Sequence, residues 1–172
     1  MAIVPAAWMP KCQMKNVVLH WTAGGYKATT HDRQFYHILI EKDGTLVRGD
    51  HTIADNVFTG DDDYAAHTRG FNTKAIGVAV CCMAEAREKP FAGGPCPMLE
   101  LQWKTMAAVA ADLARRYAIP VTEQRILGHG EVQRVHKATQ KGKWDPMVLP
   151  WEPGLSFRQV GDSFRKQVAA LM

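Results

Sequence analysis

One short apolar stretch near the start of the chain constrains the fold most strongly. Residues 17–21 read Val-Val-Leu-His-Trp, a run typical of a buried strand, and a turn of small residues follows at 22–25. The strand carries His20 near its end. Burying an unpaired imidazole costs free energy, so this side chain needs a partner. The partner is either a hydrogen bond in the core or a metal ion.

Two further stretches extend this strand into a sheet. Residues 75–82 form a second continuous apolar run, which predicts another central strand. Residues 35–40 alternate and are followed by the turn signal Asp43-Gly44 and a second short run at 45–48. This pattern predicts a β-hairpin.

The segments between these strands are mostly polar. Residues 49–74 are rich in Asp, Gly, Thr and Asn, which predicts a long loop with a short strand around 64–67. Residues 125–129 predict another short strand, which ends in a second histidine, His129. Residues 130–153 show no apolar period, and we predict irregular structure there.

Two helices complete the prediction. Apolar residues recur at spacings of three and four over residues 99–120, and residues 156–171 are amphipathic with Ser156 as N-cap. The 172 residues, 47% of them hydrophobic, suffice for one core without oligomerisation. We therefore predict a monomeric α/β protein with a central mixed β-sheet flanked by α-helices. It is a single domain over residues 1–172, with its core at about 15–150.

Charge and hydropathy limit the possible partners. The net charge of +4 comes from scattered side chains, a mild basic excess that suits a polyanion such as a bacterial cell wall or nucleic acid. The chain has no aromatic-basic motif of a nucleic-acid-binding module and no apolar run of membrane-spanning length, so neither partner is expected. Pro5 and Pro10 interrupt a start without basic residues. We therefore expect cytoplasmic synthesis without a signal peptide.

Three residues with metal-binding side chains follow from this arrangement. His20 and His129 end two predicted strands, and Asp145 lies in the loop Lys-Trp-Asp-Pro. Two imidazoles and one carboxylate form a zinc site with an open fourth position, which is typical of catalytic zinc. Spacing alone does not establish the site, because the three residues are far apart and lack the local H-E-x-x-H signature.

Several stretches, in a fixed order, resemble one enzyme family. They are residues 19–23, 36–37 leading to 43–45, 66–72, 75–78, 99–120, 128–129 and 143–146. Together they are similar to the zinc-dependent N-acetylmuramoyl-L-alanine amidases of the type-2 amidase family, which includes amidase-type phage lysozymes and peptidoglycan recognition proteins. The resemblance implies a catalytic domain that takes peptidoglycan or muropeptides as substrate and contains one catalytic zinc ion.

The resemblance also implies roles for individual residues. His20, His129 and Asp145 correspond to the zinc ligands, Tyr36 to a tyrosine beside the reactive water, and Lys143 to a lysine that faces the developing oxyanion. Fixed donors of this kind stabilise a tetrahedral intermediate. The proton for the leaving amine would be relayed through Tyr36 or Asp145.

Other polar residues have two interpretations each. His67 is expected to support a ligand or to contact substrate. Asn72 either binds substrate or serves its turn, and Trp144 either stacks on a sugar or lactyl group or packs the loop. By strand alternation, His37 points away from Tyr36 and is expected to be a hydrogen-bonded core residue.

Two departures from the family pattern refine the prediction. Residues 130–142 are long for the family and basic, and they either hold the carboxyl groups of a stem peptide or form a solvated insertion. Residues 77–81 lack the glutamate found there in family members that recycle cell wall in the cytoplasm, which favours the lysozyme-like branch.

By strand alternation Trp21 points away from the metal and into the core.

The predicted activity is zinc-dependent hydrolysis of the amide between the lactyl group of N-acetylmuramic acid and L-alanine. A phage or prophage endolysin that reaches the cell wall in the periplasm through a holin-type pore fits these features. The alternative is a non-catalytic peptidoglycan-binding protein of the same fold. The presence of all three ligand residues, His20, His129 and Asp145, favours the enzyme.

Overall fold

Two parallel strands form the centre of the sheet and are buried along their whole length. β1 (Asn16–Trp21) pairs with β4 (Ala75–Val80), and β5 (Ile126–Gly128) pairs in parallel with the other side of β1. Both central strands that the apolar runs predict are therefore confirmed. The structure, a computed structural model, describes residues 2–172.

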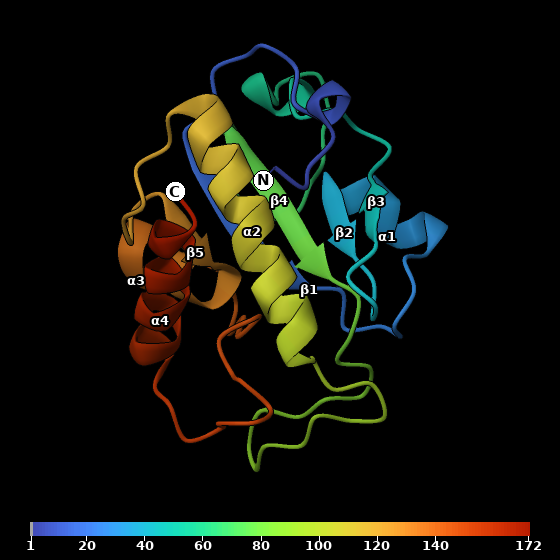
Figure 1. Ribbon diagram of the computed structural model, residues 1–172, viewed down its shortest axis with the longest axis vertical. Helices are drawn as coiled ribbons and strands as arrows, with labels where there is room; N and C mark the ends of the chain where they lie inside the picture. Colours follow the sequence, from blue (N-terminus) through green and yellow to red (C-terminus); the bar gives the residue numbers. More distant parts are fainter. Residues whose placement is uncertain (1) are drawn as a thin grey trace.

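The predicted hairpin occupies the other edge of the sheet. β2 (Ile38–Ile40) lies parallel to β4, and β3 (Leu46–Arg48) pairs with β2 in antiparallel fashion. The strand order is β3-β2-β4-β1-β5, which confirms the predicted mixed sheet (Figure 1).

The first strand of the hairpin begins later than predicted. A short helix, α1 (Thr30–Phe35), occupies the start of the expected strand. Its N-cap Thr29 accepts a hydrogen bond from the Asp32 backbone N–H, and the Asp32 carboxylate accepts one from the Thr29 backbone N–H. This capping box satisfies two backbone donors and fixes the helix start.

Two long helices cover one face of the sheet. α2 (Glu100–Tyr117) crosses β4, β1 and β2, and α4 (Phe157–Ala170) lies beside α2 and contacts β5 (Figure 1). Ser156 caps α4 by accepting a hydrogen bond from the Gln159 backbone N–H. Both predicted helices are confirmed. Since side chains alternate along a strand, Val17, Leu19 and Trp21 belong to the core under α2 while His20 points to the opposite face.

A third helix lies where irregular structure was predicted. α3 (His129–His136) begins directly after β5, so His129 is a helix residue and not a strand residue. Val132 packs with Val18 and Leu127 in a small second cluster, and the rest of the helix is mostly polar. With so few apolar residues, α3 lacks the periodic stripe by which a helix is recognised in a sequence.

The long loop over residues 49–74 contains no strand. It has one short 3-10 helix, η2 (Asp55–Val57), and another, η1 (Ala6–Trp8), lies near the N-terminus. The strand predicted around residues 64–67 is wrong, because the backbone of Ala65 pairs with the side chain of Asn56 and not with a neighbouring strand.

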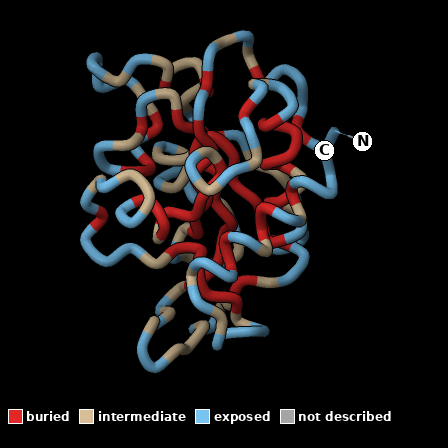
Figure 2. The backbone as a smooth tube through the Cα atoms, turned by 90° about the vertical axis from the view of Figure 1, so that its left-hand side faces the viewer, coloured by how far each residue is buried: buried red, intermediate tan, exposed pale blue. Residues whose placement is uncertain are grey.

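Figure 2 shows the buried segments gathered inside the molecule and the exposed ones at its loops. Within residues 2–172, no helix has both the length and the hydropathy of a membrane span.

Candidate metal centre

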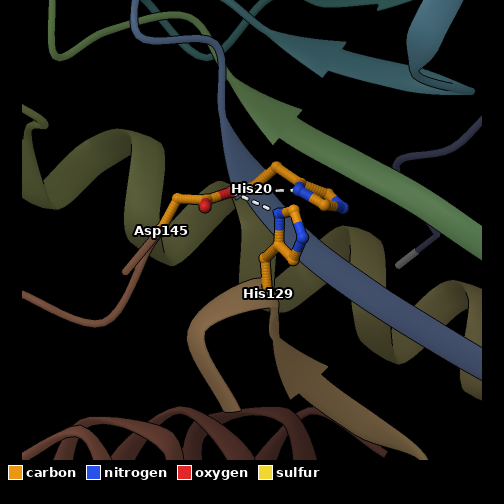
Figure 3. A group of neighbouring side chains, drawn as sticks. All are labelled: His20, His129 and Asp145. Carbon is orange, nitrogen blue, oxygen red and sulfur yellow. Dashed lines mark hydrogen bonds and ion pairs between the residues drawn. The ribbon is translucent and has the colours of Figure 1, made fainter. Parts of the chain in front are cut away.

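Three side chains converge on the face of the sheet opposite α2. His20 comes from β1, His129 from the first position of α3, and Asp145 from the loop that follows α3 (Figure 3). The Nδ1 atoms of His20 and His129 lie 3.0 and 3.2 Å from Asp145 Oδ2. All three residues are buried, and their ligand atoms lie within 4.8 Å of one another. The structure thus brings together the three residues that the sequence predicts as metal ligands.

The outer nitrogen of His20 is held by a second histidine. His20 Nε2 lies 3.2 Å from His67 Nδ1, and His67 Nε2 lies 3.3 Å from the Ala75 carbonyl oxygen. A carbonyl only accepts, so His67 donates from Nε2 and accepts at Nδ1. His20 therefore donates from Nε2, and its Nδ1 presents a lone pair to Asp145. The hydroxyl of Thr68 lies 2.8 Å from His67 Nδ1 and completes this support.

A glycine in β4 makes room for this support. A Cβ atom on Gly77 would lie 2.6 Å from Cγ of His67, which is closer than real contacts allow. The His67 ring therefore lies directly on the backbone of the strand. Any larger residue at position 77 would displace the ring that holds His20.

His129 is held in the same way by a glutamine. Its Nε2 lies 2.8 Å from Gln140 Oε1, so the ring donates outward and its Nδ1 lone pair also faces Asp145. Two imidazole lone pairs and a carboxylate oxygen then meet at one point. Acceptor atoms repel one another unless a cation lies among them, and two imidazoles with one carboxylate suit zinc. The donor set therefore fits a divalent metal ion.

The protonation states agree with this donor set. Burial lowers the pKa of His20 from 6.5 to about 4, although Asp145 opposes the shift. At neutral pH the site thus offers a neutral imidazole at His20 and a carboxylate, the forms that bind metal.

A cavity of about 210 Å³ opens beside the three ligands. Its lining includes Tyr36, Lys143 and Trp144 together with His129 and Asp145. The ring of Tyr36 lies 5.1 Å from that of His20, and burial raises the pKa of its phenol well above the ordinary value. Tyr36 therefore remains a protonated hydrogen-bond donor.

Trp144 and Trp21 meet at the edge of this cavity. Their rings pack edge to face at a centroid distance of 4.5 Å. Trp21 is buried in the core under α2, as its strand position predicts, although it also contributes to the cavity wall. Trp144 is only half-buried, so part of its ring is open to the cavity.

A second cavity of about 230 Å³ adjoins the first and shares His67, His129 and Lys143 with it. It adds Arg69 and Lys141 to the lining. Within residues 2–172 these two cations and Lys143 form no ion pair with a carboxylate. A basic hollow therefore lies next to the three ligands.

Two of the predicted polar residues lie outside both cavities. Asn72 is 8% exposed, and its Oδ1 accepts a hydrogen bond from the Thr68 backbone N–H at 2.7 Å, so it closes a turn. A substrate contact for Asn72 stays a prediction. His37 accepts from the Gly77 backbone N–H and donates to Asn56 Oδ1, as expected of a hydrogen-bonded core histidine.

Sequence reasoning missed two residues of this site. Gln140 and Thr68 support the ligands, but a glutamine in a polar loop and a threonine beside a histidine carry no recognisable signal. The residue of β4 that pairs with His20 is Ala79, so a methyl group lies where the strand passes the site. Since Ala79 cannot take part in proton transfer, Tyr36, which precedes β2, is the residue on this side of His20 that can.

Sequence comparison supplies the family. The profile described as N-acetylmuramoyl-L-alanine amidase matches residues 10–148. The chain belongs to this amidase family. No curated protein sequence is significantly similar to the chain.

Solved structures of amidases share the fold. The Ph2119 endolysin from a Thermus scotoductus MAT2119 bacteriophage superposes with a TM-score of 0.51 at 17% identity, over 91% of this chain and 88% of the endolysin. The amidase LysC from Clostridium intestinale URNW gives 0.50 at 18% identity, over 88% and 85%. The amidase AmiD from E. coli, in complex with an anhydro-muramyl peptide substrate, gives 0.53 at 18% identity, over 87% of this chain and 56% of AmiD. At these identities the likeness concerns the fold alone.

Proposed function

We propose that this member of the amidase family is a zinc-dependent N-acetylmuramoyl-L-alanine amidase. Its reaction is hydrolysis of the amide bond between the lactyl group of N-acetylmuramic acid and L-alanine in peptidoglycan. One observation carries the proposal: His20 Nδ1, His129 Nδ1 and Asp145 Oδ2 converge, and each imidazole is held at its Nε2 by a hydrogen-bond partner. Family membership alone would also allow a binding protein.

His20, His129 and Asp145 would hold the zinc ion. When bound, zinc acts as a Lewis acid that polarises a substrate carbonyl and lowers the pKa of water. The protein adds two fixed donors at the same cavity. Lys143 supplies an ammonium and Tyr36 a protonated phenol, and both suit the negative charge that develops on the carbonyl oxygen.

The leaving amine needs a proton before it departs. Tyr36 keeps its proton at neutral pH because burial raises its pKa, and it lines the same cavity as Asp145. A relay through either residue brings a proton to the scissile bond. The proton comes from the attacking water, and Tyr36 would pass it on by giving its phenol proton to the amine while it takes the proton of the water.

We assign the half-buried face of Trp144 to the sugar or lactyl group, because an aromatic ring stacks on such groups. His67 contributes through His20 and by lining both cavities, and Asn72 remains a weaker candidate contact. The basic hollow beside the ligands is the place for the carboxyl groups of the stem peptide.

The physiological role that fits best is that of a phage or prophage endolysin acting as a monomer on the cell wall. The lysozyme-like branch relies on a tyrosine where the recycling amidases use a glutamate. Here Ala79 pairs with His20 on β4 and the Tyr36 ring lies 5.1 Å from the His20 ring, which supports that branch.

Digestion of purified peptidoglycan, followed by mass spectrometry and zinc analysis of the same protein sample, tests the activity. The expected result is one zinc ion per chain and free stem peptides that begin with L-alanine. His20→Ala should retain the fold and lose both. A protein that binds zinc and peptidoglycan but releases no peptide would be a binding module, contrary to the proposal.

Expression in a bacterial host tests the endolysin role separately. The protein should accumulate without lysis until a membrane-permeabilising agent is added, after which the cell density falls. His20→Ala under the same treatment is the control. Lysis without permeabilisation, or none after it, would contradict the endolysin role while leaving the enzymatic activity intact.

A further inference from the structure

Gln140 connects the metal centre to the loop that follows α3. Its Oε1 lies 2.8 Å from His129 Nε2, and its side-chain nitrogen donates to the carbonyl oxygens of Arg69 at 2.9 Å and Ala138 at 3.2 Å. Its backbone N–H donates to Gln133 Oε1 at 2.9 Å. One residue thus joins a ligand, the end of α3 and the loop around Arg69.

The burial of Gln140 sets it apart from its neighbours. It is 5% exposed, whereas Lys137, Thr139 and Lys141 are exposed to solvent. A solvated insertion would have no reason to bury a carboxamide at this point, because a buried polar group is costly unless each of its donors and acceptors is paired. Every polar atom of the Gln140 side chain is paired here.

The hydrogen bonds fix the orientation of the carboxamide. Both side-chain N–H groups of Gln140 point to carbonyl oxygens, so a flipped amide would place an oxygen against two other oxygens. Oε1 must therefore face His129, and only the tautomer of His129 with a proton on Nε2 can donate to it. The loop consequently determines which nitrogen of His129 is left for a metal.

We propose that Gln140 is a positioning residue of the metal centre, which fixes the tautomer and ring orientation of His129 and couples them to the order of loop 137–143. The inference rests on the proposed function only in requiring that the site binds zinc. Partners of this kind raise metal affinity by about 10- to 100-fold in other sites. His20 has a separate support in His67, so the effect of Gln140 is confined to one ligand.

Two variants separate this role from general support of the loop. Gln140→Met has a similar length but no acceptor for His129. Gln133→Ala removes the bond to the Gln140 backbone and leaves the contact with His129 in place. Zinc affinity, measured in competition with a chromophoric chelator, should fall about 10- to 100-fold in Gln140→Met and stay within about threefold of the wild type in Gln133→Ala.

NMR of the zinc-loaded protein gives a readout that does not depend on activity. The Nε2 proton of His129 should be protected from exchange with water in the wild type and in Gln133→Ala, and should exchange rapidly in Gln140→Met. Equal zinc affinity in all three proteins, or an equal loss in both variants, would overturn the inference.

A third variant covers the case in which Gln140→Met fails to fold. Gln140→Ala removes the acceptor for His129 and leaves the backbone bond to Gln133 in place, so its zinc affinity should also fall about 10- to 100-fold; an affinity within about threefold of the wild type would overturn the inference. A wild-type protein that binds no zinc would overturn the proposed function as well. A wild-type protein that binds zinc and cleaves peptidoglycan while Gln140→Met is unaltered would overturn this inference alone.

Discussion

Two buried carboxylates, one in the first turn of α3 and one in the loop that follows it, are neutralised in different ways. The Glu131 side chain is fully buried and accepts from Arg165 Nη1 and Nη2 at 3.0 and 3.2 Å and from the Gly128 backbone N–H at 3.0 Å. The Asp145 side chain is 10% exposed and faces two imidazole nitrogens. Arginine is always charged, so Glu131 has its countercharge within the fold. Asp145 faces imidazoles that are neutral in the metal-binding form and gains a full countercharge only when a cation binds.

The first turn of α3 thus contains both a residue of a buried ion pair, Glu131, and a residue of the candidate metal centre, His129. Glu131, paired with Arg165, accepts a hydrogen bond from the backbone N–H of Gly128, the residue before His129. We expect this pair to fix the start of α3 and with it the position of His129. Asp145 approaches the same residue from the other side, where the Gly130 backbone N–H donates to its carbonyl oxygen at 2.8 Å. The closed pair should therefore control stability, and the open carboxylate should control metal binding.

The largest expected effect is the loss of zinc in Asp145→Asn, which keeps the shape of the side chain and removes its charge. Zinc binding and release of stem peptide should both fall to background. Thermal unfolding with and without excess zinc measures the difference. Zinc should raise the Tm of the wild type, since a ligand stabilises the state that binds it, and should leave the variant unchanged. A zinc-dependent rise in the variant would end the contrast with Glu131.

Next in size is the cost of removing Glu131. Glu131→Ala leaves the Arg165 guanidinium buried without its main countercharge and should lower the free energy of unfolding by about 3–5 kcal/mol in urea denaturation. The double variant with Glu131→Met and Arg165→Met should recover most of that loss, because neither charge remains buried. A single variant as stable as the wild type would show that the pair does not support α3.

A smaller free-energy change, confined to the reaction, is expected for Lys143→Ala. The side chain is exposed at the cavity rim and, within residues 2–172, forms no hydrogen bond or ion pair with a proposed ligand, so zinc affinity should change far less than kcat. Loss of an oxyanion donor should lower kcat by about 10²- to 10³-fold. Lys143→Arg, which keeps the charge, serves as the matched control. If zinc affinity fell and kcat did not, Lys143 would have a structural role.

The smallest effect concerns His37, a buried histidine whose hydrogen-bond partners, Asn56 and the Gly77 backbone, are uncharged. Burial lowers the pKa of His37 from 6.5 to about 4, although its hydrogen bond to Asn56 opposes the shift. Between these values the unfolded chain binds a proton and the folded protein does not, so stability is present above about pH 6.5 and is lost as the pH falls towards about 4.

For His37 this loss should reach about 2 kcal/mol between pH 7 and pH 5 in the zinc-free protein. Urea denaturation at the two pH values measures it. His37→Gln should lose less stability over the same interval, by about that amount. Parallel losses in the two proteins would mean that His37 is not neutral when folded.

Those elements whose apolar pattern is complete in the sequence were predicted correctly. β1 and β4 are continuous apolar runs because both of their faces are covered, and α2 carries an apolar stripe because it lies across the sheet. α1 has no buried residues and so carries no apolar stripe, although Thr29 and Asp32 form a capping box.

The structure also contains features that the sequence does not reveal. Glu131 of α3 pairs with the distant Arg165, and no local pattern in the sequence indicates that pair. The three proposed ligands were predicted from family resemblance and from strand ends, yet Gln140 looks like any polar loop residue until the fold places it against His129. Supporting contacts between distant segments require the tertiary structure, and residue type and spacing alone do not supply them.

The position of β1 between β4 and β5 has a consequence for how fast metal is exchanged. A strand paired on both sides exchanges its amide hydrogens only when the domain unfolds, whereas exposed loops open locally and often. His20 is fixed to the slow part, and His129 depends on the loop around Gln140. With zinc bound as proposed, its exchange should therefore be faster when that loop opens, although β1 and His20 stay in place.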